Sequence, residues 1–265
     1  MRAPRRRVRP DTGIPLRAVV PNAVTAAALC FGLTGIRFAI AADWERAVLM
    51  ILIAGVLDGV DGRIARMIGG ESRFGAELDS LADSISFGVS PAIIMYLWAL
   101  IEVPKLGWII ALLYAAFGAL RLARFNAQID ATEQPHKSAG FLTGVPAPAG
   151  AAIAMLPLYL WIFTDLDLFR SPWIVTPWVA FAAFLMVSSI ATYSWGSLKL
   201  RRRIRFEALV VVAIIVAALV TAPWQTLSAL TIGYVVTIPF SYRSYAKVRR
   251  QRANMARAVP NEPEQ

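Results

Sequence analysis

Residues 58–83 read DGVDGRIARMIGGESRFGAELDSLAD, and this stretch places Asp58, Asp61, Asp79 and Asp83 inside an otherwise strongly apolar sequence. An ionisable side chain at membrane depth is costly unless it faces a polar cavity, a partner or a cation. Asp58 and Asp61 are three residues apart, and Asp79 and Asp83 are four apart, so each pair shares one face of a helix. The stretch therefore predicts a helical hairpin that gathers four carboxylates at a functional site.

The composition around this hairpin is that of a polytopic membrane protein. The chain has 265 residues, of which 57% are hydrophobic, and a mean hydropathy of +0.57. A spanning helix needs about 20 mostly apolar residues, which predicts an all-α membrane bundle. The sequence contains about eight candidate stretches, approximately 20–42, 46–67, 76–100, 106–128, 146–164, 173–193, 206–222 and 225–243.

The positive charges predict the orientation of this bundle. Of the 27 Lys and Arg, 23 fall in the two terminal segments and in alternate connections, including the one inside the hairpin. Because Lys and Arg stay on the cytoplasmic side, we expect both termini and the carboxylates there. The formal charge of +10 is spread in short clusters between apolar runs, which argues against a nucleic-acid-binding surface. The predicted organisation is a basic juxtamembrane segment at 1–20, a transmembrane catalytic domain at 21–245 and a basic, disordered tail at 246–265.

Four carboxylates together would repel one another strongly, and a divalent cation would relieve that repulsion. Oxygen ligands without Cys or His favour Mg²⁺ or Mn²⁺, and the single cysteine, Cys30, excludes a cysteine-based site. Two such ions close together are a recurrent device for displacement at phosphorus. Gly62 and Gly75 stand beside the acids and would admit a ligand against the backbone. Arg66 would meet a phosphate or balance the acids, or would serve only as a topology charge.

The spacing Asp58-x2-Asp61-Gly62-x2-Ala65-Arg66-x8-Gly75-x3-Asp79-x3-Asp83 resembles the signature of the CDP-alcohol phosphotransferases, with every fixed position filled. This resemblance implies a six-helix core with about two additional C-terminal helices. It also implies a membrane enzyme of phospholipid biosynthesis in a bacterial or archaeal plasma membrane. Such an enzyme transfers a substituted phosphoryl group from a CDP-linked alcohol to a second alcohol and releases CMP. The resemblance further suggests a homodimer embedded among membrane lipids.

The same resemblance assigns roles to individual residues. The four aspartates would hold two divalent ions, and Asp83 would also act as general base toward the acceptor hydroxyl. The residues expected to contact the nucleotide-linked lipid are Asn22, Thr25, Gly62, Arg66, Ser72 and Gly75. Asn22 and Thr25 belong to a Pro-Asn-x-x-Thr entry at residues 21–25, although on spacing alone Asn22 is a helix cap.

Three further segments indicate the acceptor. SISFGVSPA at 84–92, RLARFN at 121–126 and FLTGVPAPAGAA at 141–152 resemble the phosphatidylserine synthase branch of the family. The resemblance implies CDP-diacylglycerol as donor and L-serine as acceptor. Arg121 and Arg124 could present a guanidinium to the serine carboxylate, or they could be topology charges. Ser86 could line the acceptor's route, or could satisfy a helix backbone.

Alternatives remain open at this point. Glycerol 3-phosphate or an inositol phosphate would be accepted by the same chemistry, and a divalent-cation transporter would use the same acids as a transit site. His136, the only histidine, stands in the polar connection TEQPHKSAG and is interpreted as solvated rather than catalytic.

Overall fold

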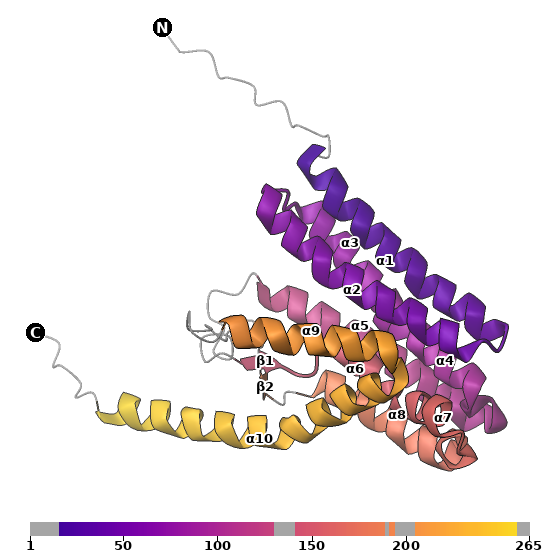
Figure 1. Ribbon diagram of the computed structural model, residues 1–265. Coiled ribbons are helices and arrows are strands. Elements are labelled where there is room, and N and C mark those ends of the chain that lie inside the picture. Colours follow the sequence, from indigo (N-terminus) through magenta and orange to yellow (C-terminus); the bar gives the residue numbers. More distant parts are fainter. Residues whose placement is uncertain (1–15, 130–140, 189–190, 194–204, 259–265) are drawn as a thin grey trace, which may run out of the picture.

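The computed structural model describes residues 16–129, 141–188, 191–193 and 205–258, and it is a bundle of helices (Figure 1). Two three-residue strands pair antiparallel, with Leu142 opposite Thr192. The elements in chain order are α1 Leu16–Ile40, α2 Trp44–Ile68, α3 Arg73–Asp83, the π-helix η1 Ser84–Val89, α4 Ser90–Trp98, the 3₁₀ turn η2 Leu100–Glu102, α5 Pro104–Ile129, β1 Phe141–Thr143, α6 Ala147–Ala154, α7 Leu156–Thr164, the 3₁₀ turn η4 Asp167–Arg170, α8 Pro172–Val187, β2 Ala191–Tyr193, α9 Arg205–Thr221 and α10 Pro223–Ala258.

Each of the eight apolar stretches predicted from the sequence overlaps a helix or a run of consecutive helices, although the stretch 173–193 extends beyond the end of α8 at Val187 and includes the strand β2. Among the described residues, three helical runs are long and apolar enough to cross a membrane, namely Val19–Ile40, Arg73–Trp98 and Pro104–Ala127. A fourth is added if α6 and α7, which are bent by 43° at Met155, count as one span. Helix α8 has only 16 residues, and α2 carries the first two aspartates of the hairpin. The prediction of an all-α polytopic membrane protein is therefore confirmed, while the described part of the chain does not contain eight full-length spans.

Small side chains allow the first two helices to approach closely. Ala28, Ala39, Ala47 and Ala54 are all buried on α1 and α2. A Cβ at Gly35 of α1 would lie 3.1 Å from the Ala47 carbonyl oxygen of α2. Such contacts between small residues are the usual basis of helix pairing in membranes. They fix the position of α2, which carries half of the carboxylates.

Prolines within the bundle leave helical carbonyls without their usual amide donors, and side chains from other helices replace them. Pro157 has no N–H for the Ile153 carbonyl one turn earlier, and the indole Nε1 of Trp178 donates to that oxygen at 2.7 Å. Pro91 likewise cannot serve the Phe87 carbonyl, which accepts from the Tyr114 hydroxyl at 3.1 Å. Because an unpaired buried carbonyl is costly, these two bonds link α8 to α6 and α5 to η1.

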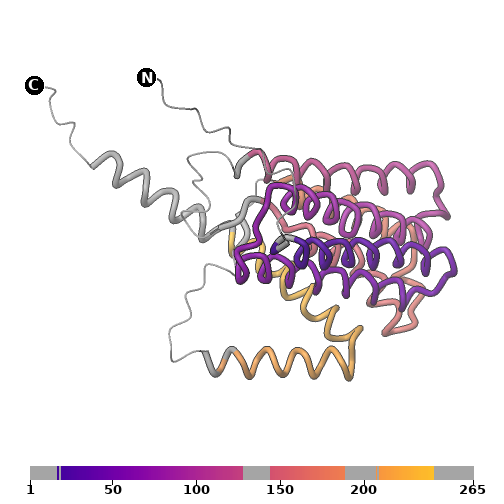
Figure 2. Tube along the Cα trace, turned by 90° about the horizontal axis from the view of Figure 1, so that it is seen from above, coloured from indigo at the N-terminus to yellow at the C-terminus, as the bar shows by residue number. Residues whose placement is uncertain are grey.

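The last two helices lie at the edge of the bundle. Figure 2 shows α9 apart from the other helices and joined to them by α10, and α10 packs against α7, α6 and β2. Helix α10 continues to Ala258, so residues 246–258 are helical where the sequence predicted a disordered tail. The physical reason is that this segment is rich in Ala and Arg, which favour helices. Residues 259–265 and His136 lie outside the described residues.

Candidate metal and substrate site

Three of the four predicted carboxylates converge between α2 and α3. Asp58, Asp61 and Asp79 each offer a carboxylate oxygen, and these oxygens lie within 4.8 Å of one another. Asp61 is buried, and the other two are half-buried. Among the described residues none of the three forms an ion pair. An all-oxygen set with uncompensated charge fits a hard divalent cation, so these residues could hold Mg²⁺ or Mn²⁺.

Asp83 lies beside this triad. Its side chain is within hydrogen-bonding distance of Asp58, and it also interacts electrostatically with Asp79 and with Arg121 of α5. The hairpin thus brings the four aspartates together, as the sequence predicted. Its interaction with Arg121 connects the hairpin to α5.

Helix α1 supports the triad through Thr25. The Thr25 hydroxyl donates to Oδ2 of Asp61 at 2.6 Å. The hydroxyl oxygen of Thr25 is also 3.1 Å from the carbonyl oxygen of Pro21, one turn earlier in α1. Both Thr25 and Asp61 are buried, with 5% and 4% of their surface exposed. A donor to one carboxylate oxygen leaves the other free and fixes its direction, which is how supporting residues orient metal ligands. Thr25 therefore supports an aspartate, whereas the sequence placed it near the nucleotide.

Asn22 lies within α1, because the helix begins at Leu16 and includes Pro21. The interpretation of Asn22 as a helix cap is therefore wrong, since residues 16–20, before Pro21, are already helical. Its Oδ1 would be 2.8 Å from a Cβ at Gly75, so only glycine at 75 leaves this amide in place. Its Nδ2 is buried and has no hydrogen-bond partner among the described residues. A buried amide donor without a partner is costly, and a ligand oxygen would satisfy it.

The remaining predicted donor-site residues line the same hairpin. The guanidinium of Arg66 is beside Gly62, where a Cβ would lie 3.6 Å from its Nη1. Ser72 is the N-cap of α3, and its Oγ accepts from the Gly75 amide at 3.0 Å. A Cβ at Gly59 would meet nothing within 4 Å, so the face of α2 next to Asp58 is open. The structure thus places Arg66 beside Gly62 and Asn22 beside Gly75, and it gives Ser72 a capping role.

Asp83 is followed directly by the π-helix η1, which the sequence did not predict. Single π-helical turns are rare and frequent at functional sites. The wider turn lets η1 pack closely on α5, where Cα of Gly88 would lie 3.5 Å from a Cβ at Gly118. The Tyr114 bond to Phe87 holds this turn from the α5 side. The sequence gives only a weak signal for the contact between Tyr114 and the Phe87 carbonyl, namely Pro91 four residues after Phe87 and a tyrosine later in the chain.

The residues predicted to bind the acceptor lie in different surroundings in the structure. Arg121 is half-buried and faces Asp83, while Arg124 is exposed and its Nη1 donates to the Val187 carbonyl at the end of α8 at 3.2 Å. Ser86 is 1% exposed, and its hydroxyl is 3.4 Å from the Ala28 carbonyl of α1. Arg124 and Ser86 therefore have structural partners, and Arg121 alone lies beside the aspartates. Asn126, also in this segment, donates from Nδ2 to Ser80 Oγ of α3 at 2.8 Å.

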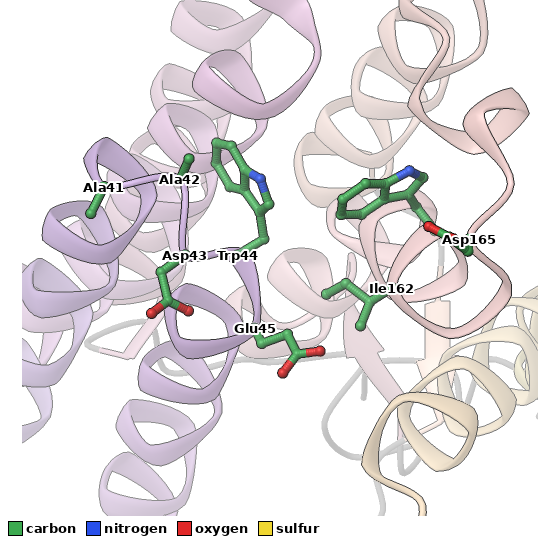
Figure 3. A pocket seen from close by; sticks show the side chains of 8 residues that line it. Ala41, Ala42, Asp43, Trp44, Glu45, Ile162 and Asp165 are labelled. Carbon is green, nitrogen blue, oxygen red and sulfur yellow. The ribbon is translucent and has the colours of Figure 1, made fainter.

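A cavity of about 490 Å³ lies at the other end of α2 (Figure 3). Its lining includes Trp44, Trp161, Glu45 and Asp165. Trp44 opens α2, and at the rise of a helix Asp61 is about 25 Å further along the axis. Trp44 and Trp161 at this end of α2 are consistent with a membrane–water interface, where tryptophan is enriched. The cavity is thus separate from the carboxylate site.

A helical bundle with membrane-spanning helices and carboxylates that converge on one hairpin defines an integral membrane protein whose site could hold a divalent cation. The sequence profile described as CDP-alcohol phosphatidyltransferase matches residues 18–239. The chain belongs to this family.

Named relatives agree with this assignment. The chain is 39% identical over 226 residues, 85% of its length, to the CDP-diacylglycerol–serine O-phosphatidyltransferase of Mycobacterium tuberculosis, of which the match covers 79%. It is 38% identical over 223 residues, 84% of its length, to the protein of the same name from Mycobacterium leprae, of which 74% is covered. A match of 41% over 104 residues, 39% of this chain and 46% of the relative, joins it to the protein of that name from Methanocaldococcus jannaschii.

The Thr25 contact yields a first prediction. In Thr25→Val, Asp61 loses its hydroxyl donor, and we expect Mn²⁺ to bind about 10-fold to 100-fold more weakly. Electron paramagnetic resonance titration of the purified protein with Mn²⁺ measures this directly. Thr25→Ser keeps the hydroxyl and serves as the matched control. Equal Mn²⁺ affinity in the Val and Ser variants would show that Thr25 does not orient the triad.

Proposed function

We propose that the protein transfers the phosphatidyl group of CDP-diacylglycerol to the hydroxyl of L-serine, giving phosphatidylserine and CMP. The observation that carries this proposal is the triad of Asp58, Asp61 and Asp79 on the α2–α3 hairpin, with Asp83 at its α5 side, in a chain of this family. The serine acceptor is supported by the names of the relatives from Mycobacterium tuberculosis and Mycobacterium leprae.

The donor binds where α1, α2 and α3 meet. Asp58, Asp61 and Asp79, with Asp83 at their edge, would hold two divalent ions, Mg²⁺ or Mn²⁺. Such ions, when bound, neutralise the negative charge that develops on the leaving group. Arg66 and the Asn22 amide provide donors for phosphate or nucleotide oxygens. Gly62 and Gly75 keep the backbone accessible, because neither adds a side chain at the hairpin.

The reaction then requires one proton transfer and one displacement. An oxygen of Asp83 accepts the proton of the serine hydroxyl. The serine oxygen forms a bond to the phosphorus that carries the diacylglycerol, and the bond from that phosphorus to the bridging oxygen breaks, so CMP leaves with the bridging oxygen. Arg121 stands next to Asp83 and pairs with the serine carboxylate. The acyl chains stay in the bilayer between helices.

The main test is release of CMP from CDP-diacylglycerol by the purified protein in detergent or vesicles. We expect release that requires both L-serine and a divalent cation. Parallel reactions with glycerol 3-phosphate and inositol phosphate examine the other acceptors, and product in those arms without product from serine would refute the acceptor assignment. Uptake of Mg²⁺ or Mn²⁺ into proteoliposomes without CMP release would instead support a transporter.

Asp83→Asn tests the proton acceptor. The amide keeps the size of the side chain but cannot accept the proton, so we expect kcat to fall about 100-fold or more. The apparent Kd for CDP-diacylglycerol should change by no more than about twofold, because the triad remains. Asp165→Asn is the matched control, since Asp165 borders the distant cavity and asparagine tolerates its left-handed backbone, φ 55°. A kcat near wild type in Asp83→Asn would exclude this residue as the base.

We also propose that the carboxylate site and both termini face the cytosol, where CMP, serine and divalent cations are available. This rests on the bias of Lys and Arg toward one set of connections. A green fluorescent protein fused after Gln265 should fluoresce, whereas alkaline phosphatase at the same position should be inactive. The reverse result would invert the topology. A homodimer fits the family, and its test is the mass of the protein in detergent.

A further inference from the structure

A side-chain hydrogen bond joins α5 to α3 in the stretch between Asp79 and Asp83. Nδ2 of Asn126 donates to Oγ of Ser80 at 2.8 Å. Ser80 follows Asp79 directly and stands three residues before Asp83. The Asn126 and Ser80 side chains are both half-buried. The bond therefore attaches α3 to α5 at the point where α3 carries its two carboxylates.

The direction of this bond follows from the use that Ser80 makes of its own proton. The Ser80 hydroxyl donates to the Ala76 carbonyl, one turn earlier in α3, at 3.0 Å. A hydroxyl has a single proton to donate, so its partner on α5 must be a donor, and the Asn126 amide is one. Because the bond to Ala76 ties the hydroxyl to the backbone of α3, the bond from Asn126 acts on the helix and not on a freely rotating side chain.

Apolar burial contributes little to the orientation of α3. Ala82 is its one buried residue, while Phe74 and Leu81 expose 54% and 63% of their surface. An alanine removes little apolar surface from water, so it gives the helix a weak preference for one rotation about its axis. Polar contacts must therefore supply much of that preference.

Helix α5 holds the chain on both sides of Asp83. After Asp83, the Tyr114 hydroxyl donates to the Phe87 carbonyl in the buried π-helix η1. Before Asp83, the corresponding attachment to α5 is the bond from Asn126 to Ser80. Tyr114 belongs to the core, with 0% of its surface exposed, so changing it would disturb the packing of the bundle. Asn126 is half-buried and can be changed with less damage.

A small rotation of α3 would displace both of its carboxylates. Side chains end about 5 Å from a helix axis, so a rotation of about 10° moves a carboxylate by about 1 Å. A misplacement of about 1 Å can lower the rate of a reaction about 100-fold. Asp79 is one of the three carboxylates whose oxygens lie within 4.8 Å of one another, so the same rotation would disturb the triad.

We propose that Asn126 is a positioning residue that acts through Ser80. It holds α3 at the rotation that places Asp79 in the triad and Asp83 beside it. This inference rests on the proposed function and adds to it a role for a residue that contacts neither cation nor substrate in that scheme. A contact from Nδ2 of Asn126 to the acceptor would require this amide to release Ser80 first.

The test uses Asn126→Leu and Ser80→Ala, which remove the two partners singly with little change in size. Electron paramagnetic resonance titration of the purified protein measures Mn²⁺ binding, and CMP release measures kcat. We expect each variant to bind Mn²⁺ about 10-fold more weakly and to lose about 10-fold or more in kcat. The double variant should lose no more than either single variant, because the two residues act through one bond.

Two further variants are controls. Ser80→Thr keeps a hydroxyl that can bond to the Ala76 carbonyl, and it should stay within about twofold of wild type in both measurements. Thr34→Ala removes a hydroxyl that donates to the Cys30 carbonyl, one turn earlier on α1, at 2.6 Å. It matches the loss of the Ser80 bond within its own helix but lies outside α3 and α5, so it should change neither measurement.

The outcomes separate this inference from the proposed function. Wild-type Mn²⁺ affinity and kcat in Asn126→Leu would overturn the role of Asn126. Additive losses in the double variant would also overturn it, because the two residues would then act separately. If wild-type protein releases no CMP with L-serine, the proposed function fails, and the Mn²⁺ titrations of the same variants still decide whether Asn126 positions α3.

Discussion

The mutual repulsion of buried carboxylates is the constraint on which the rest of this structure depends. Asp58, Asp61 and Asp79 are held close together at the boundary of an apolar bundle, where charge is poorly solvated. Such a cluster is stable only if its surroundings are rigid and if a cation or bound substrate compensates it. The rigid surroundings are visible in the close α1–α2 packing, where alanine and glycine allow the backbones to touch, and in the Thr25 bond to Asp61. Structural order near the hairpin is thus a requirement of its chemistry.

The second constraint is that backbone carbonyls inside the bundle need hydrogen-bond donors. It explains why certain side chains donate to carbonyls of other helices. In an apolar medium a carbonyl released by proline has no water to bond. Tyr114 serves the Phe87 carbonyl near Pro91, and Trp178 serves the Ile153 carbonyl near Pro157. Arg170 likewise donates from Nε to the Trp98 carbonyl at the end of α4, at 3.0 Å. These bonds satisfy carbonyls at the bends and ends of short helices.

The parts of the site that lie close in sequence could be predicted from it, and the others could not. Two pairs of aspartates at helical spacing, joined by a short connection, have few ways to fold, so the hairpin and its cluster followed from periodicity and charge. The helix start at Leu16 did not follow, because Pro21 suggested a beginning and Asn22 a cap, whereas α1 begins five residues before Pro21 and runs through both. The helical state of residues 246–258 was missed because their polarity outweighed their helix propensity in the interpretation. The contacts from Thr25 to Asp61 and from Tyr114 to Phe87 join distant segments, and no local pattern encodes them.

The part of the site proposed to bind the donor was easier to predict from the sequence than the part proposed to bind the acceptor. The donor half consists of α1, α2 and α3, which are consecutive, so its geometry is set by residue spacing and two short connections. The acceptor half of the proposed site combines Asp83 of α3 with Arg121 of α5, which lie on helices that are not consecutive in the chain. Its geometry depends on how whole helices pack, so no single segment of the sequence encodes it. The π-helix after Asp83 lies at the junction, since it ends the donor hairpin and begins the contact with α5.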